Sequence, residues 1–230
     1  MEASVVVANA DASQIYNQLI TDQIAVFRKP RASLRKATPS VAGFSILLGI
    51  KKSPGIQKMG HHTVLFPKKY EDEFTSIFSS HTPVKDPAIY ICAPSDSLMN
   101  RGAETEGWTI LVNAPRHSFE KGEWNWMDSR FAEEYADSIL DKIESRGILV
   151  KDRIQFREIR TPADLESAVL APGGAIYGTS SNGANAAFSR ARNRSPLQGL
   201  YCVGGSAHPG GGLPLVAISA EIVADLVGRA

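Results

Sequence analysis

A glycine-rich loop near the end of the chain has the composition of a site that binds an anion. Five glycines fall within residues 204–212, between the apolar segments Leu200–Val203 and Leu213–Val227. Glycines remove side chains from a loop, so a ligand can come close to the backbone. A helix that begins at Leu213 directs its free N–H groups and the positive end of its dipole back towards the loop. The pattern therefore predicts a site for an anion, or for a group that becomes anionic.

The residues predicted to bind this ligand come from the loop and from a second segment near the N-terminus. In the loop and at the helix start the candidates are Gly204, Gly205, Ser206, Gly210, Gly211, Gly212 and Leu213. Asn9 and Asp11 follow the apolar run Val5–Ala8 and are further candidates, although Asp11 serves equally well as the N-cap of a short helix. The loop glycines do not follow the G-x-G-x-x-G spacing of dinucleotide-binding folds, and no lysine of a phosphate-binding loop follows them.

Histidines and cysteines supply fewer candidates. His208 precedes Pro209 inside the loop and is the one candidate catalytic residue, although such a histidine more often fixes its loop. His61 and His62 open a predicted strand without nearby acidic partners, so we expect a structural role there and no metal site. Two cysteines, Cys92 and Cys202, are too few for a disulfide scaffold or a zinc site built from cysteines.

Two kinds of predicted secondary structure position these residues. The short apolar runs at 5–8 and 200–203 are typical of strands buried on both faces of a parallel sheet. Between them, strands are predicted at 44–49, 62–66, 89–92 and 108–112, and helices at 70–78, from about 127 to Gly147, and from Thr161. We expect a mixed or antiparallel sheet covered by helices. The segment 213–227 is apolar nearly all round, which predicts a buried helix.

The composition narrows the class of protein. The 230 residues carry 25 Lys and Arg against 24 Asp and Glu, a net charge of +1, so nothing points to nucleic acid as a partner. No apolar run approaches the roughly 18–20 residues of a membrane-spanning helix, and the N-terminus lacks the features of a signal peptide. We therefore expect a reduced cytoplasmic protein that is soluble or lies at most on a membrane surface.

The segment Gly199–Pro214, which reads GLYCVGGSAHPGGGLP, closely resembles the C-terminal signature of the phytoene desaturase family of carotenoid desaturases. Weaker matches follow the family order elsewhere, at 7–11, 47–50, 61–66, 86–90, 161–164 and 174–178. The resemblance covers nearly the whole chain. Members of that family are longer and begin with a β-α-β unit that carries a glycine fingerprint, and this sequence has no such fingerprint.

The resemblance implies an α/β (α+β) chain with part of an FAD-binding fold and a substrate domain built on a mixed or antiparallel sheet. Residues 1–20 would return to the FAD-binding domain, 21–170 would bind substrate, and 171–230 would supply the C-terminal FAD-binding segment. It also implies FAD as cofactor, a carotenoid or other polyene as substrate, and a missing N-terminal dinucleotide-binding half in the same gene or in a separate chain. The apolar strands and helix favour the same conclusion, because the chain offers few partners to cover them.

The implied substrate also predicts where the protein works. A carotenoid dissolves in lipid, so we expect reversible, peripheral contact with a membrane through an apolar rim. Two other interpretations stay open. The first is another flavin oxidoreductase, such as a polyene isomerase, a retinoid saturase or an amine oxidase-like enzyme. The second is a non-catalytic module that binds an apolar ligand or partner.

Overall fold

The computed structural model describes residues 2–21, 24–53, 59–96, 98, 104–180 and 190–228. The chain divides into two compact units. Unit 1 combines Met1–Val41 with Leu165–Ala230, and unit 2 is the segment between them, Ala42–Asp164. Unit 2 is therefore an insertion into unit 1.

The compact units change after residues 41 and 164, whereas the functional domains expected from the sequence change after residues 20 and 170. The segment that follows residue 20 packs against the N-terminal helices, where Arg31 donates from Nε to the carbonyl oxygen of Tyr16 at 2.5 Å. The ring of Phe27 lies 5.5 Å from that of Tyr16, between centroids. These contacts place residues 21–41 in unit 1, and the sequence showed no pattern from which to predict them.

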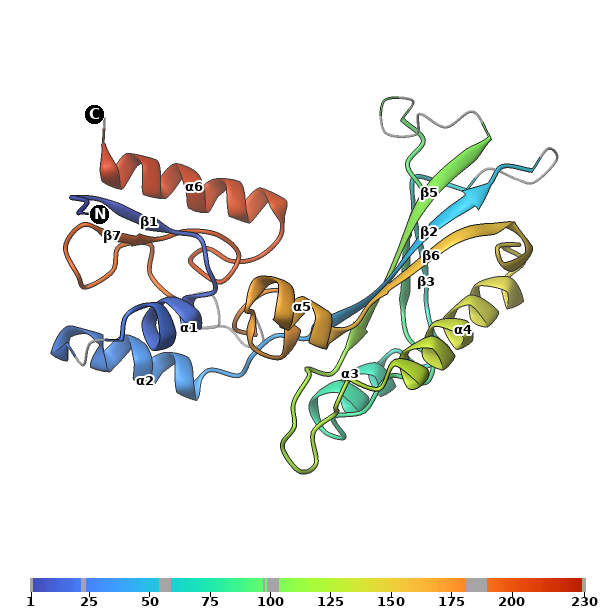
Figure 1. Ribbon diagram of the computed structural model, residues 1–230, viewed down its shortest axis with the longest axis horizontal. Helices are drawn as coiled ribbons and strands as arrows, with labels where there is room; N and C mark the ends of the chain where they lie inside the picture. Colours follow the sequence, from blue (N-terminus) through green and yellow to red (C-terminus); the bar gives the residue numbers. More distant parts are fainter. Residues whose placement is uncertain are drawn as a thin grey trace. The chain divides into compact units, whose positions relative to one another are not determined.

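Unit 1 is built around a two-stranded parallel sheet of β1 (Val6–Ala8) and β7 (Leu200–Cys202). Leu200 and Cys202 share a core with Ile15, Tyr16 and Phe27. Ile15 and Tyr16 belong to the π-helical turn η1 (Ile15–Leu19), and Phe27 belongs to η2 (Ala25–Phe27). The other short elements in this stretch are α1 (Ala12–Gln14) and α2 (Arg28–Lys36). Figure 1 shows α1 and α2 on one side of the strand pair and α6 (Leu213–Val227) on the other.

The parallel pairing of the first and last strands confirms the sequence-based prediction, and β1 and α6 are left largely uncovered, in line with the few partners that the sequence offers them. Val6 and Val7 are 48% and 50% exposed, and Leu213 is 87% exposed. Only Ser219 and Val223 of α6 are buried. Two short strands and one helix cannot cover all of each other's apolar surface, so much of that surface faces outwards among the described residues.

Unit 2 contains a five-stranded antiparallel sheet in the order β3-β4-β5-β2-β6. The strands are β2 (Ala42–Lys51), β3 (His62–Leu65), β4 (Ile89–Cys92), β5 (Thr105–Ala114) and β6 (Ile154–Arg160). The four strands predicted from the sequence are present, and β6 was not predicted because its burial does not alternate cleanly. Parallel and antiparallel sheets together with helices agree with the mixed fold class expected.

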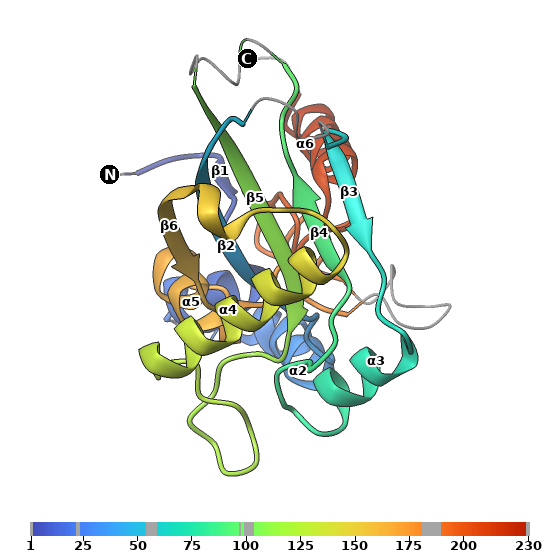
Figure 2. The same cartoon turned by 90° about the vertical axis from the view of Figure 1, so that its right-hand side faces the viewer.

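Helix α4 (Ser129–Ser145) covers one face of this sheet, as Figure 2 shows. Alternate side chains of β2 point into the shared core: Phe44, Ile46, Leu48 and Ile50. They meet the apolar stripe of α4, which includes Tyr135, Ile139 and Ile143. The side chain of Asp128 caps the helix by accepting from two backbone N–H groups, and Gly147, at φ +82°, follows its last turn as predicted. The intervening residues of β2 face away from α4.

Two carboxylates, those of Glu73 and Asp86, connect the remaining segments of unit 2 by hydrogen bonds. Glu73 of α3 (Glu71–Phe78) is 1% exposed and accepts from Ala88 N–H at 2.7 Å and from Asn113 Nδ2 at 2.8 Å. Asp86 accepts from the backbone of Lys68 and from Lys142 Nζ, each at 3.2 Å. Partial burial raises the pKa of Asp86, but these hydrogen bonds together with the positive charges of Lys142 and Arg146 outweigh it, so its pKa lies below the usual value.

Shorter elements join the two units along the chain. Helix α5 (Pro162–Val169) begins where Thr161-Pro162 predicted, with Thr161 Oγ1 accepting from Asp164 N–H at 3.2 Å. The single turns η3 (Lys151–Arg153) and η4 (Pro172–Gly174) precede β6 and follow α5. Among the described residues, no helix has the length and apolar character needed to cross a bilayer.

Candidate cofactor-binding site

The glycine loop runs from the end of β7 to the start of α6, and a buried asparagine is hydrogen-bonded to it. Asn193 is 5% exposed, and its Nδ2 donates to the carbonyl of Cys202 at 3.1 Å and to that of His208 at 2.9 Å. The same amide lies 3.0 Å from Ser219 Oγ in α6. One side chain thus joins the strand, the loop and the helix.

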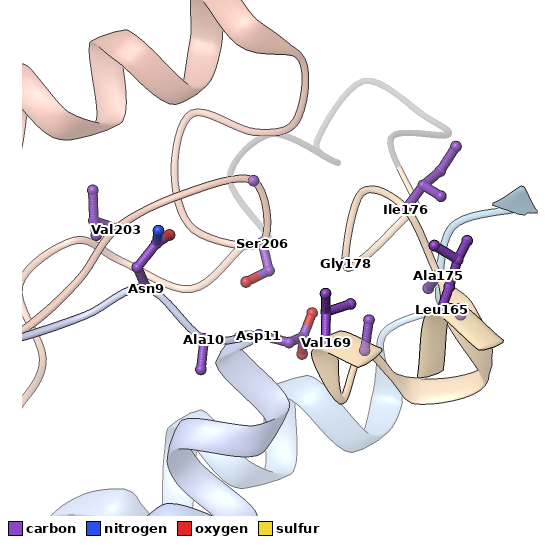
Figure 3. A pocket seen from close by; sticks show the side chains of 13 residues that line it. Asn9, Ala10, Asp11, Leu165, Val169, Ala175, Ile176, Gly178, Val203 and Ser206 are labelled. Atoms are coloured by element: carbon purple, nitrogen blue, oxygen red, sulfur yellow. The ribbon is translucent and has the colours of Figure 1, made fainter. Parts of the chain in front are cut away.

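A cavity of about 350 Å³ lies beside the first part of this loop, entirely within unit 1. It is lined by Asn9, Ala10, Asp11, Leu165, Val169, Ala171, Gly174, Ala175, Ile176, Gly178, Val203, Gly205 and Ser206. Figure 3 shows Asn9 and Ser206 on one side of it and the apolar Leu165, Ala175 and Ile176 on the other. Polar groups therefore face an apolar wall, which is the usual makeup of a small-molecule pocket.

Four of the residues predicted from the sequence meet at this cavity: Asn9, Asp11, Gly205 and Ser206. Asp11 also caps α1, because its Oδ1 accepts from Ser13 N–H at 2.8 Å and from Ser13 Oγ at 2.6 Å. Ser206 Oγ accepts from Ala12 N–H at 2.9 Å and so ties the loop to the same helix start. The capping role of Asp11 is therefore observed, and it does not conflict with a position at the cavity.

Gly204 is required by its conformation and by its neighbour. Its φ is +102°, and a Cβ there would lie 2.2 Å from Asn9 Oδ1. The backbone N–H of Gly204 lies 3.2 Å from Ser219 Oγ. The glycine thus lets the loop pass close to the end of β1, which brings Asn9 and Gly205 to one cavity.

The structure does not place the second half of the loop in the cavity lining. A Cβ on Gly210 would lie 3.1 Å from Arg190 Nε, and one on Gly211 would lie 2.2 Å from the ring of Tyr177. These two glycines pack against the chain itself. Within the part of the chain that the structure describes, a Cβ on Gly212 would meet nothing within 4 Å, and Leu213 projects outwards. The N-terminus of α6 is thus exposed at Gly212 and Leu213, whereas the ring of Tyr177 covers it at Gly211.

His208 is held in the loop by both of its backbone groups. Its N–H donates to the carbonyl of Ala191 at 2.8 Å, and its own carbonyl accepts from Asn193. The His208–Pro209 peptide bond is cis. His208 does not line the cavity, so what the structure shows of this residue is its part in fixing the loop.

Arg190 is a residue of the site that sequence reasoning did not select. It is 6% exposed, and its Nη1 donates to the carbonyl of Tyr177 at 2.7 Å and to that of Gly205 at 3.0 Å. Burial lowers the pKa of its guanidinium. The sequence shows only arginines at 190, 192 and 194; nothing in that spacing distinguishes the buried one from the two exposed ones.

Comparison with known proteins places these features in a family. No protein-family model matches the chain. The chain is 34% identical over 229 residues to 1-hydroxycarotenoid 3,4-desaturase from Flavobacterium sp. (strain P99-3), and 31% identical over 234 residues to a neurosporene-forming phytoene desaturase from Rhodobacter capsulatus. It is 28% identical over 233 residues to 4,4'-diapolycopene oxygenase from Methylomonas sp.. The matches cover 98%, 99% and 99% of this chain in that order.

A solved structure supports the fold assignment. The crystal structure of an oxidoreductase from Methanosarcina mazei matches with a TM-score of 0.51 and 11% identity, over 97% of this chain and 43% of that one. The chain spans less than half the length of the curated relatives it matches, between 43% and 44% of those named above. It belongs to the carotenoid desaturase family, which includes diapolycopene oxygenases, and corresponds to the C-terminal half of its members. The resemblance drawn from the glycine loop is thereby confirmed.

Proposed function

We propose that the chain is part of an FAD-dependent oxidoreductase that desaturates a carotenoid in carotenoid biosynthesis. The observation that carries the proposal is the cavity in unit 1, where the end of β1 and the glycine loop meet. The names of the relatives, which include desaturases of hydroxylated and unhydroxylated carotenoids, support the same reaction class. The proposed activity needs a dinucleotide-binding half, which we propose corresponds to the part of the relatives that this chain does not cover.

The residues at the cavity fit a portion of FAD. The volume of the cavity, about 350 Å³, lies at the low end of the roughly 300–1,000 Å³ of small-molecule sites, so the cavity accommodates one ring system and not the whole dinucleotide. Asn9 and Ser206 would bind polar edges, and Gly205 would let the backbone approach closely. When bound, FAD supplies the hydride-accepting chemistry of the reaction. The open N-terminus of α6 at Gly212 and Leu213 would stabilise negative charge through its backbone N–H groups.

The sheet face of unit 2 that points away from α4 is suited to a polyene. In the β2–β5 register Gly49 lies opposite Gly107, and among the described residues nothing lies within 4 Å of a Cβ placed on Gly107. A cavity of about 320 Å³ lies there, with Leu47 and Phe156 among its lining residues. Phe156 is 55% exposed. A strip without side chains between apolar residues gives an extended hydrocarbon a flat surface to lie on.

The exposed apolar residues of unit 1 fit a partner half better than water. Val6 and Val7 of β1 and Leu215 and Ile218 of α6 are each at least 40% exposed. Exposed apolar patches mark interaction sites, and we infer that these residues belong to one. We propose that the N-terminal dinucleotide-binding half covers it, in the same polypeptide or as a separate chain. We also propose that the assembled enzyme binds membranes peripherally to reach its lipid-dissolved substrate.

The test is reconstitution with the N-terminal half of the Flavobacterium relative. The mixture, and neither part alone, should show a protein-bound flavin spectrum, colour change with a carotenoid, and flotation with liposomes. Replacing Asn9 by alanine should weaken FAD binding roughly 2- to 12-fold, as expected for one hydrogen bond. Asn17→Ala, an exposed change in the same unit, serves as the matched control. A mixture that binds no flavin would refute the proposal.

Oxygenation of a polyene is a second candidate reaction, because diapolycopene and diaponeurosporene oxygenases occur among the relatives. The product distinguishes the two reactions by mass. Desaturation removes two hydrogen atoms from the carotenoid, whereas oxygenation adds oxygen.

A further inference from the structure

Two histidines and a cysteine of unit 2 form a cluster with the donor set of a metal site. The ligand atoms of His61, His62 and Cys92 all lie within 4.8 Å of one another. Within the described part of the chain, no other three His, Cys, Asp or Glu side chains gather in this way. The cluster belongs neither to the cavity beside the glycine loop nor to the glycine strip of the sheet.

The strand register brings the three residues together. His62 of β3 lies directly opposite Cys92 of β4, and side chains in such a pair share one face of the sheet. His61 precedes β3, and its carbonyl accepts from Ala93 N–H at 2.9 Å, which anchors it at the same point. Because His61 lies outside the strand, its ring does not have to point to the opposite face. It packs against the ring of His62, with centroids 4.5 Å apart.

Tyr90 holds the ring of His62 in a defined orientation. Its hydroxyl lies 2.7 Å from His62 Nδ1, and the two rings stack with an interplanar angle of 20°. When Nδ1 carries the proton and donates it to the Tyr90 oxygen, Nε2 presents its lone pair to an ion. Histidines that bind metals usually donate their other ring N–H to an oxygen in this manner.

We propose that His61, His62 and Cys92 bind one Zn²⁺ ion, with a fourth position left for water. Imidazole nitrogen and thiolate sulfur suit this borderline-soft ion, whereas Mg²⁺ and Ca²⁺ require oxygen ligands. Tetrahedral zinc separates its ligand atoms by about 3.5 Å, so the side chains need to move by only about 1 Å. His62 is exposed and the other two are half-buried, so an ion has access. Binding releases the thiol proton of Cys92 to solvent.

The site is tested by titrating the metal-free 230-residue chain with Zn²⁺ by calorimetry and with Co²⁺ by absorbance. We expect one ion per chain and a thiolate-to-cobalt charge-transfer band. Cys92→Ser should abolish that band, and His62→Ala should raise the dissociation constant of Zn²⁺ roughly 10- to 100-fold, an effect comparable to losses at known metal sites. His81→Ala, a change in the same unit outside the cluster, should leave the affinity within about twofold. Circular dichroism checks that each variant is folded.

A measurement on the unchanged protein keeps the proposal testable if a variant unfolds. Zn²⁺ should protect Cys92 from a thiol reagent, and Mg²⁺ at the same concentration should not. The proposal is overturned if Cys92→Ser binds Zn²⁺ as tightly as the unchanged chain, or if Zn²⁺ fails to slow modification of Cys92.

Discussion

Replacing Gly178 by alanine should destabilise unit 1 by roughly 2–5 kcal/mol. Gly178 has φ +67°, and the left-handed conformation costs a residue with a Cβ about 1–2 kcal/mol. The new Cβ would lie 2.6 Å from Ser206 Cβ and 2.8 Å from its Cα, and overpacking of this kind costs about 1–3 kcal/mol. Neither side gives way easily: the Gly178 carbonyl accepts from Ser40 N–H at 2.8 Å, and Ser206 Oγ accepts from Ala12.

Hydrogen exchange measured by mass spectrometry reports this loss for each unit separately. A change of 2–5 kcal/mol corresponds to an increase of roughly 30- to several-thousand-fold in the exchange rate of the β1 and β7 amides that open with unit 1. The amides of β2 and β5 in unit 2 should be unaffected. Gly228→Ala is the matched control, because Gly228 has φ +80° and no described atom lies within 4 Å of its Cβ position. Equal exchange in the two variants would refute the packing argument.

Four further outcomes follow from the contacts described. Asn193→Ala should lower the stability of unit 1 by about 1–3 kcal/mol, seen as faster exchange of α6 amides. Glu73→Gln should lower that of unit 2 by about 1–3 kcal/mol in urea unfolding followed by tryptophan fluorescence, because its NH₂ group faces one of the two former donors. The pKa of Asp86 is lowered in the fold, so its contribution to the stability of unit 2 is complete above pH of about 4 and is lost as the pH falls further. Asp86→Asn should remove this pH dependence of stability. The loss should be less than about 1 kcal/mol, because the ion pair of Asp86 with Lys142 is partly exposed. Cys202 is 1% exposed and burial raises the pKa of its thiol, so it should react with a thiol reagent only after unfolding, whereas Cys92 reacts in the native chain.

Each of these predictions has a control or an outcome that contradicts it. Exchange of the β2 amides should not respond to the Asn193 change, and fluorescence unfolding should not respond to it either, since all three tryptophans lie in unit 2. A Glu73→Gln variant as stable as the unchanged chain would show that the buried carboxylate is not required. If unit 2 keeps its acid sensitivity in Asp86→Asn, another carboxylate is responsible. Two fast-reacting thiols in the native chain would contradict the burial of Cys202.

The sequence predicted the elements whose pattern is local. The limits of α6 agree with the predicted segment 213–227 at both ends, since a glycine precedes it and another follows it. Thr161 and Asp11 were predicted as caps and are observed as caps. The helix α2 was missed, because most of its residues are polar or charged and its place is set by contacts such as that of Arg31 with Tyr16.

The candidate site was predictable only in part, because side-chain placement depends on packing between distant segments. The meeting of Asn9 with Gly205 depends on parallel pairing of strands at opposite ends of the sequence. Arg190 is buried, unlike Arg192 and Arg194, where it donates to the carbonyls of Tyr177 and Gly205, and both carbonyls belong to segments distant from it in sequence. The histidine–cysteine cluster does not follow from residues adjacent in sequence, because the β3–β4 register is what brings Cys92 to His62.

The way unit 2 is attached has a consequence for how this family can diversify. Ser45, near the point where the chain enters the sheet, pairs with Arg160, near the point where it leaves. Entry and exit are therefore neighbours on adjacent antiparallel strands, a geometry in which insertion of a whole domain is tolerated. An entire 42–164 module could be exchanged between homologues by two crossovers at these strands, leaving the glycine loop and its cavity intact. Under the proposed function, recombination at this pair of strands would change the proposed substrate surface of unit 2 and retain the proposed cofactor site of unit 1.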